Sequence, residues 1–238
     1  MGELHTVKRA IIMAAGVGNR LRPVTLKTPK PLVKVNGERM IDSVIKALKI
    51  NGINEIYVVV GYLKEQFYFL EEKYDGLKII ENPYYDKCNN ISSLYVAREY
   101  LSDCIILDGD QIIYNPDILS KSFTLSGYNA VWTDDETDEW LMDVKDGIVK
   151  SCSRNGGKGG FRLYSVSRWS EEDGKKLKNY LEYEFERGNN RIYWDDVAMF
   201  CHFEDFTLGI REMKETDIIE IDNFDELIKI DSSYAACE

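Results

Sequence analysis

The segment Ala14–Pro23 follows a short apolar stretch and has the composition of an anion-binding loop. Gly16 and Gly18 allow backbone N–H groups to approach an anion closely, and successive N–H groups of this kind form a concave anion site. Arg20 adds a planar cation that can donate two parallel hydrogen bonds to phosphate oxygens. We therefore expect this loop to bind phosphate groups through Ala14, Ala15, Gly16 and Gly18.

Two familiar phosphate loops do not fit this segment. A Walker loop ends in Gly-Lys-Ser/Thr, which is absent here, and a dinucleotide fingerprint needs a third glycine where Leu21 stands. Pro23, Pro29 and Pro31 also prevent a helix from opening directly after the loop. These residues exclude an NAD-binding oxidoreductase and leave a different kind of phosphate site, in which Lys30 is a further cation.

Asp108-Gly109-Asp110 closes the apolar stretch Cys104–Leu107 and is the best candidate for a metal-binding motif. Mg²⁺ prefers one or two carboxylates together with phosphate and water oxygens, and Asp110 could supply one of them. The alternative is a turn in which an aspartate caps the backbone. A second carboxylate must come from elsewhere, and Tyr193-Trp194-Asp195-Asp196 is the best candidate, although Asp195 could equally cap a helix starting near Val197.

The chain as a whole is acidic, since its 238 residues carry a formal net charge of −11. Such a chain repels nucleic acid and anionic membranes, so we expect neither as a partner. Residues 4–37 are the exception, because they contain lysines and arginines but no acid. The absence of a long apolar run and of any CxxC pair predicts a reduced, cytoplasmic protein. Only two histidines are present, which leaves little for Ser-His-Asp or Cys-His catalysis.

The elements that must position these residues alternate between strands and helices, which predicts an α/β fold with crossover helices. The first half predicts strands at Arg9–Ala15, Glu55–Val60, Leu77–Ile80 and Cys104–Leu107, and helices at Met40–Asn51, Lys64–Tyr74 and Ser92–Leu101. The second half predicts antiparallel strands at Tyr128–Thr133, Leu141–Val144, Ile148–Cys152 and Phe161–Val166, a helix at Glu171–Arg187 and a strand–helix pair within Ile218–Ile230. No linker or repeat interrupts the chain, so we expect one domain over residues 1–238.

The loop continues into Thr28-Pro29-Lys30-Pro31-Leu32 and Val35-Asn36-Gly37, and together these motifs resemble the nucleotidyltransferases that activate sugar phosphates. The resemblance implies a Rossmann-like, three-layer fold with a mixed, mostly parallel sheet, in which about residues 8–125 bind nucleotide and about 126–238 bind the acceptor. It also implies catalytic roles for Arg20 and Lys30, which would neutralise charge around the reacting phosphorus. By the same resemblance Asp110 and Asp195 would bind Mg²⁺, with Asp196 as the alternative to Asp195.

Further motifs resemble one branch of this superfamily, the bacterial CTP:phosphocholine cytidylyltransferases. The motifs are Val60–Phe67, Asn89-Asn90 with Ser93-Leu94-Tyr95, Glu139-Trp140 and Tyr193-Trp194-Asp195. This resemblance implies CTP and phosphocholine as small-molecule substrates. Asn90 and Ser93 carry groups that can read a base edge, but they do not separate cytosine from uracil.

A quaternary ammonium cannot donate hydrogen bonds and is recognised by aromatic faces and nearby carboxylates. Trp140, Tyr193 and Glu220 have this chemistry and are our candidates for binding the acceptor. The acceptor could instead be phosphoethanolamine, 2-aminoethylphosphonate or a sugar 1-phosphate, and a nucleotide sensor without activity could share the same fold. We interpret Asn155–Gly160 as a glycine-rich turn without a functional role.

Overall fold

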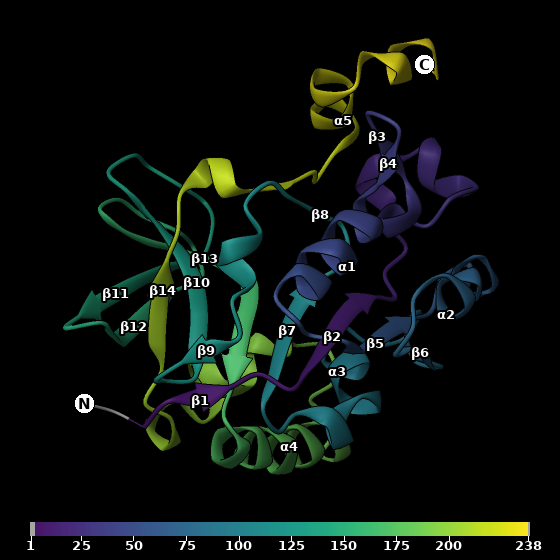
Figure 1. Cartoon of the computed structure of the whole chain (residues 1–238). Helices are drawn as coiled ribbons and strands as arrows, with labels where there is room; N and C mark the ends of the chain where they lie inside the picture. Colours follow the sequence, from purple (N-terminus) through teal and green to yellow (C-terminus); the bar gives the residue numbers. More distant parts are fainter. Residues whose placement is uncertain (1–2, 238) are drawn as a thin grey trace.

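The computed structural model describes residues 3–237, and a nine-stranded sheet runs through the middle of them (Figure 1). The strands follow one another in the order β10 (Gly127–Thr133), β14 (Gly209–Glu212), β12 (Ile148–Ser153), β11 (Leu141–Lys145), β13 (Gly160–Trp169), β7 (Cys104–Asp108), β2 (Arg9–Ala14), β5 (Glu55–Val60) and β6 (Leu77–Glu81). β13 also pairs with β10. The sheet therefore joins the first and second halves of the chain through the β13–β7 pair.

The two halves of the sheet have different strand directions. β6, β5, β2 and β7 are all parallel, so their carboxyl ends meet at one edge. β13 is antiparallel to β7, and the strands beyond it are antiparallel apart from the parallel pair β10–β14. The predicted α/β fold with a mixed sheet is confirmed, but the sheet is not mostly parallel, because β13 and the strands beyond it pair mainly in the antiparallel sense. Because ligands bind beyond the carboxyl ends of parallel strands, this edge is where a site is expected.

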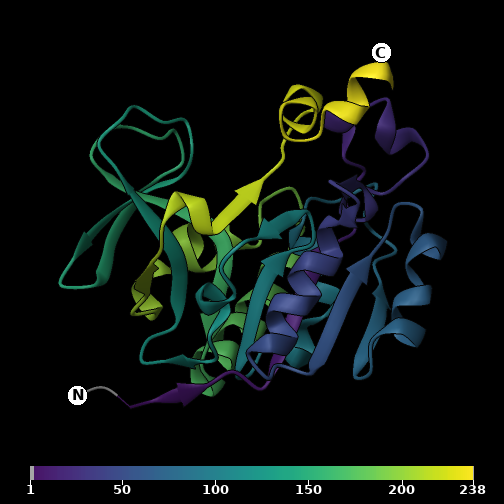
Figure 2. The same ribbon diagram turned by 45° about the horizontal axis from the view of Figure 1, so that its top comes forward.

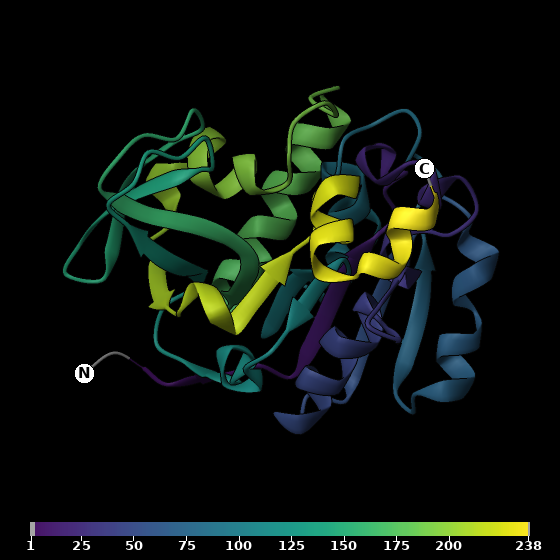
Figure 3. The same cartoon turned by 90° about the horizontal axis from the view of Figure 1, so that it is seen from above.

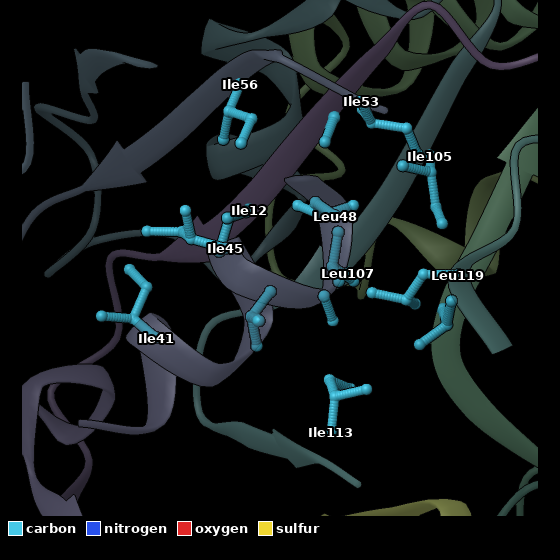
Figure 4. Packing of buried hydrophobic residues seen from close by; sticks show 14 of the residues in the cluster. Ile12, Ile41, Ile45, Leu48, Ile53, Ile56, Ile105, Leu107, Ile113 and Leu119 are labelled. Atoms are coloured by element: carbon cyan, nitrogen blue, oxygen red, sulfur yellow. The ribbon is translucent and has the colours of Figure 1, made fainter. Parts of the chain in front are cut away.

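Helices cover both faces of the parallel strands, because the side chains of each strand alternate between the faces. Ile12 of β2 packs against Ile41 and Ile45 of α1 (Met40–Ile50), as Figure 4 shows. Its neighbour Ile11 lies in the cluster on the other face, with residues of α3 (Ile91–Val96) and α4 (Glu171–Glu186). These two cores fix the strand ends from which the functional side chains emerge.

The C-terminal segment crosses the carboxyl edge of the sheet (Figure 3). It begins with β15 (Ile218–Glu220), which pairs with β8 (Gln111–Ile113), and continues into α5 (Phe224–Ile230). The segment Ala14–Pro23 is called the glycine loop below. Its residue Leu21 shares a small buried cluster with Ile221 and Leu227 of the C-terminal segment. The end of the chain thus holds a loop that lies about two hundred positions earlier in the sequence.

Some predicted elements differ from the structure. The predicted helix Lys64–Tyr74 is a 3-10 turn at Lys64–Phe67 followed by the short helix α2 (Phe69–Lys73). The predicted helix at Ser92–Leu101 is α3 and a 3-10 turn, and the strands β8 and β14 were not predicted. Two further short pairs join β1 (His5–Thr6) to β9 (Ser122–Phe123) and β3 (Lys34–Val35) to β4 (Glu38–Arg39). Among the described residues, no helix is long and apolar enough to cross a membrane.

Candidate active site

The glycine loop begins where β2 ends, and its shape brings Lys30 close to the loop backbone. Gly18 has a φ of +66°, and a Cβ at this position would lie only 3.0 Å from the Cβ of Lys30. The hydroxyl of Thr25 donates to the Gly18 carbonyl at 2.8 Å and holds the turn. A larger residue at Gly18 would strain the backbone and push Lys30 away. The loop lines a cavity of 300 Å³ through Ala14, Gly16, Gly18, Arg20 and Lys30, among others.

Lys30 lies between two carboxylates at the centre of this edge. Its Nζ is 2.6 Å from Asp110 Oδ2 and 3.4 Å from Asp222 Oδ1, with only 11% of its side chain exposed. Burial alone would lower the pKa of Lys30, but the attraction of the two carboxylates outweighs it and raises the pKa above the ordinary value. Lys30 is therefore a firmly charged ammonium group that faces the cavity.

Asp222 was not predicted as a site residue; nor were Asp108, Glu139, Leu163 and Ser165, which also line the cleft. Asp222 Oδ1 accepts a hydrogen bond from Arg20 Nη2 at 2.8 Å, and the Arg20 side chain is otherwise 71% exposed. Glu220-Ile221-Asp222 repeats the spacing of Asp108-Gly109-Asp110, with two acids separated by one residue at the end of a strand. That repeated spacing was the available signal.

A second cavity, of 290 Å³, continues from the first. Its lining consists of Arg20, Lys30, Asn90, Asp108, Asp110, Glu139, Trp140, Leu163, Ser165, Tyr193, Asp195, Glu220 and Asp222. Arg20, Lys30, Asp110 and Asp222 line both cavities, so the two form one cleft. The structure therefore places the predicted phosphate loop, metal ligands and acceptor residues along a single opening.

The end of the cleft farthest from the glycine loop is aromatic. The rings of Trp140 and Tyr193 are 6.0 Å apart and nearly perpendicular, at 88°. The ring of Phe200 lies 5.2 Å from that of Trp140 and nearly perpendicular to it, and the guanidinium of Arg154 lies 5.8 Å from the Trp140 ring. Two ring faces with carboxylates beside them suit a cationic group of a ligand.

Asp195 and its neighbour Asp196 have different surroundings. Asp196 accepts a hydrogen bond from Arg154 Nε at 2.7 Å and another from the Tyr193 N–H at 2.8 Å, and it does not line the cleft. Asp195 does line the cleft and is 8% exposed, and its buried Oδ1 has no hydrogen-bond partner of standard geometry among the described residues. Of the two, Asp195 is the carboxylate available to a ligand or metal.

Acidic side chains gather in the cleft, and their surroundings favour the neutral form. Burial raises the pKa of Asp195 to about 7, and burial together with the charges of Asp110 and Asp222 raises the pKa of Glu220 to about 7. Burial, and then repulsion from Asp110 and Glu220, raises the pKa of Asp108 well above its usual range. These carboxyl groups outnumber Arg20 and Lys30, and their raised pKa values show that the cations of the cleft do not suffice to keep all of them ionised.

A divalent cation fits this shortage of positive charge. No three acids, histidines or cysteines of residues 3–237 converge as a ready-made metal cage. Mg²⁺ does not need one, because it binds through one or two carboxylates and takes its remaining oxygens from phosphates and water. Asp110 and Asp195 both line the cleft and offer such carboxylates. Asp222 is linked to Asp110 through Lys30, which contacts both.

Three of the predicted nucleotide-binding residues, Ala15, Asn90 and Ser93, form hydrogen bonds within the protein. Ala15 and Ser93 do not line the cleft. The Ala15 carbonyl accepts a hydrogen bond from the Tyr62 N–H at 3.1 Å. The Ser93 hydroxyl accepts one from the Asn82 amide at 3.0 Å and is buried. Asn90 does line the cleft, while its Oδ1 accepts the Trp194 N–H at 2.8 Å. Ala15 and Ser93 are thus placed to support the loops around the cleft.

Comparison with known proteins adds an independent observation. Residues 9–122 match the family described as nucleotidyl transferase. The chain is 37% identical to the 2-aminoethylphosphonate cytidylyltransferase of Lancefieldella rimae, over 94% of this chain and 92% of that protein. It is 35% identical to the choline-phosphate cytidylyltransferase of Streptococcus pneumoniae, over 94% and 96% respectively. The chain belongs to the nucleotidyl transferase family.

The structural similarity to a solved cytidylyltransferase covers nearly the whole of this chain. The solved CTP:phosphocholine cytidylyltransferase of Streptococcus pneumoniae superposes with a TM-score of 0.86 at 34% identity, covering 96% of this chain and 99% of that one. The match therefore extends beyond residues 9–122 to the second half of the sheet. It confirms the predicted nucleotidyltransferase fold and the resemblance to the cytidylyltransferase branch.

Proposed function

We propose that this nucleotidyl transferase forms CDP-choline and pyrophosphate from CTP and phosphocholine. The observation that carries the proposal is the continuity of the cleft, because a loop suited to a triphosphate and an aromatic, acidic end share Arg20, Lys30, Asp110 and Asp222. Two substrates can therefore meet in one opening. The cytidylyltransferase names of both relatives support CTP as the nucleotide.

In the proposed reaction a phosphate oxygen of phosphocholine attacks the α-phosphorus of CTP. A new P–O bond forms as the bond from the α-phosphorus to pyrophosphate breaks. The acceptor phosphate is a dianion near neutral pH, so no general base is needed, in agreement with a chain that has only two histidines. Catalysis then consists of positioning and charge stabilisation, in which Arg20 and Lys30 hold the triphosphate and offset charge developing on pyrophosphate.

We propose Mg²⁺ as the cofactor. Asp110 and Asp195 would hold it, and Glu220 and Asp222 are further carboxylates in the lining of the same cleft. When bound, the ion would supply positive charge close to the phosphates, where the cleft has an excess of acids. We place the reaction in the cytoplasm, where nucleoside triphosphates are made.

A second acceptor has specific support. The relative at 37% identity is named for 2-aminoethylphosphonate, which carries a primary ammonium instead of the trimethylammonium of choline. Both acceptors present an anion at one end and a cation at the other, as the cleft requires. Trp140 and Tyr193 favour the quaternary cation, because a ring face does not require a hydrogen-bond donor.

The test is a matrix of pyrophosphate-release assays with Mg²⁺. The acceptors are phosphocholine, 2-aminoethylphosphonate, phosphoethanolamine and glucose 1-phosphate, each with CTP and with UTP. We expect the highest kcat/KM for CTP with phosphocholine. A higher value with 2-aminoethylphosphonate would replace the acceptor but keep the chemistry, whereas nucleotide binding without pyrophosphate release from any pair would favour a sensor.

A further inference from the structure

Two loops beside the acceptor end of the cleft are joined to each other through their backbones. One loop, residues 134–140, connects β10 with β11, and the other, residues 154–159, connects β12 with β13. Thr137 and Gly157 exchange two backbone hydrogen bonds of 2.9 Å, and Figure 2 shows the loops rising side by side. We call these two loops the flap.

Glycine is required where the two loops meet. Gly156 has a φ of +66°, and a Cβ there would lie 1.7 Å from the Thr137 carbonyl oxygen. Any side chain would force the loops apart, since the obstacle is backbone. Gly159 has a similar φ of +71°, but a Cβ at this position would meet nothing within 4 Å. The glycine-rich turn at Asn155–Gly160 therefore has a positional role that its composition did not reveal.

The flap places two adjacent side chains, those of Glu139 and Trp140, at the acceptor end. The Thr137 hydroxyl accepts a hydrogen bond from the Glu139 N–H at 3.1 Å, which fixes the backbone just before Trp140. Both side chains line the cleft, and Glu139 also lines a neighbouring cavity of 330 Å³ together with Glu220 and Asp222. The paired loops thus bring a carboxylate and an aromatic ring to the same place.

The Glu139 carboxylate is available to a ligand. Within residues 3–237 no donor forms a hydrogen bond or ion pair with it, whereas Glu220 accepts from Gln111 at 2.6 Å and Asp222 from Arg20. Arg162, the nearby cation, attracts the charge of Glu139 but is hydrogen-bonded to Glu215 at 2.7 Å. Glu139 is therefore an exposed carboxylate beside a ring, with no hydrogen-bonded counter-ion among the described residues.

We propose that Glu139 is the counter-ion of the acceptor's ammonium group, and that the Gly156–Thr137 contact positions it. The proposal rests on the proposed function for the class of acceptor. A quaternary ammonium takes no hydrogen bond, so its recognition combines a ring face with a carboxylate at close range. Trp140 supplies the ring and Glu139 the charge, which makes Glu139 a residue that selects cationic acceptors.

The first experiment separates charge from shape. Phosphocholine is compared with 3,3-dimethylbutyl phosphate, an isostere in which an uncharged tert-butyl group replaces the trimethylammonium group. Both ligands are tested with the wild-type protein and with Glu139→Gln. We expect Glu139→Gln to raise KM for phosphocholine about tenfold, and to leave unchanged the KM of the isostere, or its Ki if it is not turned over. KM for CTP should also stay the same. Glu136→Gln, on the same loop but outside the cleft lining, is the matched control.

An equal change for both ligands, or no change for either, would overturn the proposal. If the wild-type protein releases no pyrophosphate with phosphocholine, the proposed acceptor is wrong, and the same comparison is made with 2-aminoethylphosphonate and the neutral propylphosphonate. Selective loss of the ammonium ligand would then still support Glu139, and its absence would reject it. The two failures are therefore distinguishable.

The second experiment tests the positioning contact. Gly156→Ala should raise KM for the ammonium acceptor severalfold while KM for CTP stays within twofold. Gly159→Ala has a similar backbone strain but no contact with the other loop, so it should leave both KM values near the wild type. The combined loss in the double variant Glu139→Gln/Gly156→Ala should be smaller than the losses of the two single variants multiplied together, because part of the effect of Gly156→Ala acts through Glu139. A loss equal to that product, or equal effects of the two alanines, would reject the positioning role.

Discussion

Lys30 is the central cation of the cleft, because it forms ion pairs with two carboxylates. It contacts Asp110 and Asp222, and Asp222 also holds Arg20. A triphosphate that enters the cleft offers both cations new partners, and the carboxylates it releases become available to a metal ion. Because these interactions strengthen as charge moves toward pyrophosphate, Lys30 should act on turnover as well as on binding.

We therefore predict that Lys30→Ala lowers kcat/KM by about two to three orders of magnitude, as removal of a charge-stabilising group does elsewhere. Asp110→Asn should have an effect of similar size. The measurement is steady-state pyrophosphate release, with circular dichroism to show that the fold survives. Lys27→Ala, a cation of the same segment outside both cavities, is the control. Near-normal turnover in both the Lys30→Ala and the Asp110→Asn variant would show that the proposed mechanism is wrong.

Among the elements, the contact between α1 and the end of α2 depends on one buried carboxylate. Asp42 of α1 accepts hydrogen bonds from Lys73 Nζ and the Tyr74 hydroxyl, each at 2.9 Å, and is 5% exposed. Burial would raise the pKa of Asp42, but these donors outweigh it and lower the pKa below its ordinary value. The ionised form is thus the one that the fold stabilises.

The sign of the pH dependence follows from the lowered pKa. The stabilisation is present above the pKa of the unfolded chain, near 4, and is lost as pH falls through the lower folded pKa. We predict that Asp42→Asn lowers the free energy of unfolding by about 1–2 kcal/mol at pH 7. In urea titrations the difference from the wild type should shrink below pH 4. Asp75→Asn, at an exposed acid, should show neither effect; an undiminished difference at low pH would contradict this account.

At the scale of the whole molecule, the two predicted functional parts share one sheet. β13 pairs with β7 over Val166–Trp169, and the strands of both parts continue outward from this pair. The C-terminal segment then returns to the glycine loop through the cluster that contains Leu21 and Leu227. Neither part can bury its surfaces alone, because each forms part of the core of the other.

We predict a single unfolding transition for the whole chain. All four tryptophans lie in the second part, at Trp132, Trp140, Trp169 and Trp194, so their fluorescence reports on the acceptor half. Far-ultraviolet circular dichroism reports on both halves. The two signals should have the same midpoint in urea, as expected for one cooperative unit. Separate midpoints would show that the parts unfold independently.

Local patterns determined much of the fold. Glu55–Val60 was predicted with its observed bounds, since a strand buried on both faces is a continuous apolar run. The glycine loop was recognisable because its conformation depends on Gly18 and its neighbours. β14 was not predicted, because its four residues form a strand by pairing with β10 and β12, both far earlier in the chain.

Local periodicity and short motifs were therefore enough to predict the class of fold, the glycine loop as a candidate phosphate site and most residues that line the cleft. Only the tertiary structure decided that Asp222 faces Arg20 across 202 positions and that Asp195, not Asp196, opens into the cleft. It also decided that Ser93 supports a loop and that Gly156 lies against the backbone of the loop carrying Glu139. These roles depend on which distant groups satisfy a charge or a hydrogen bond, and no local pattern contains that information.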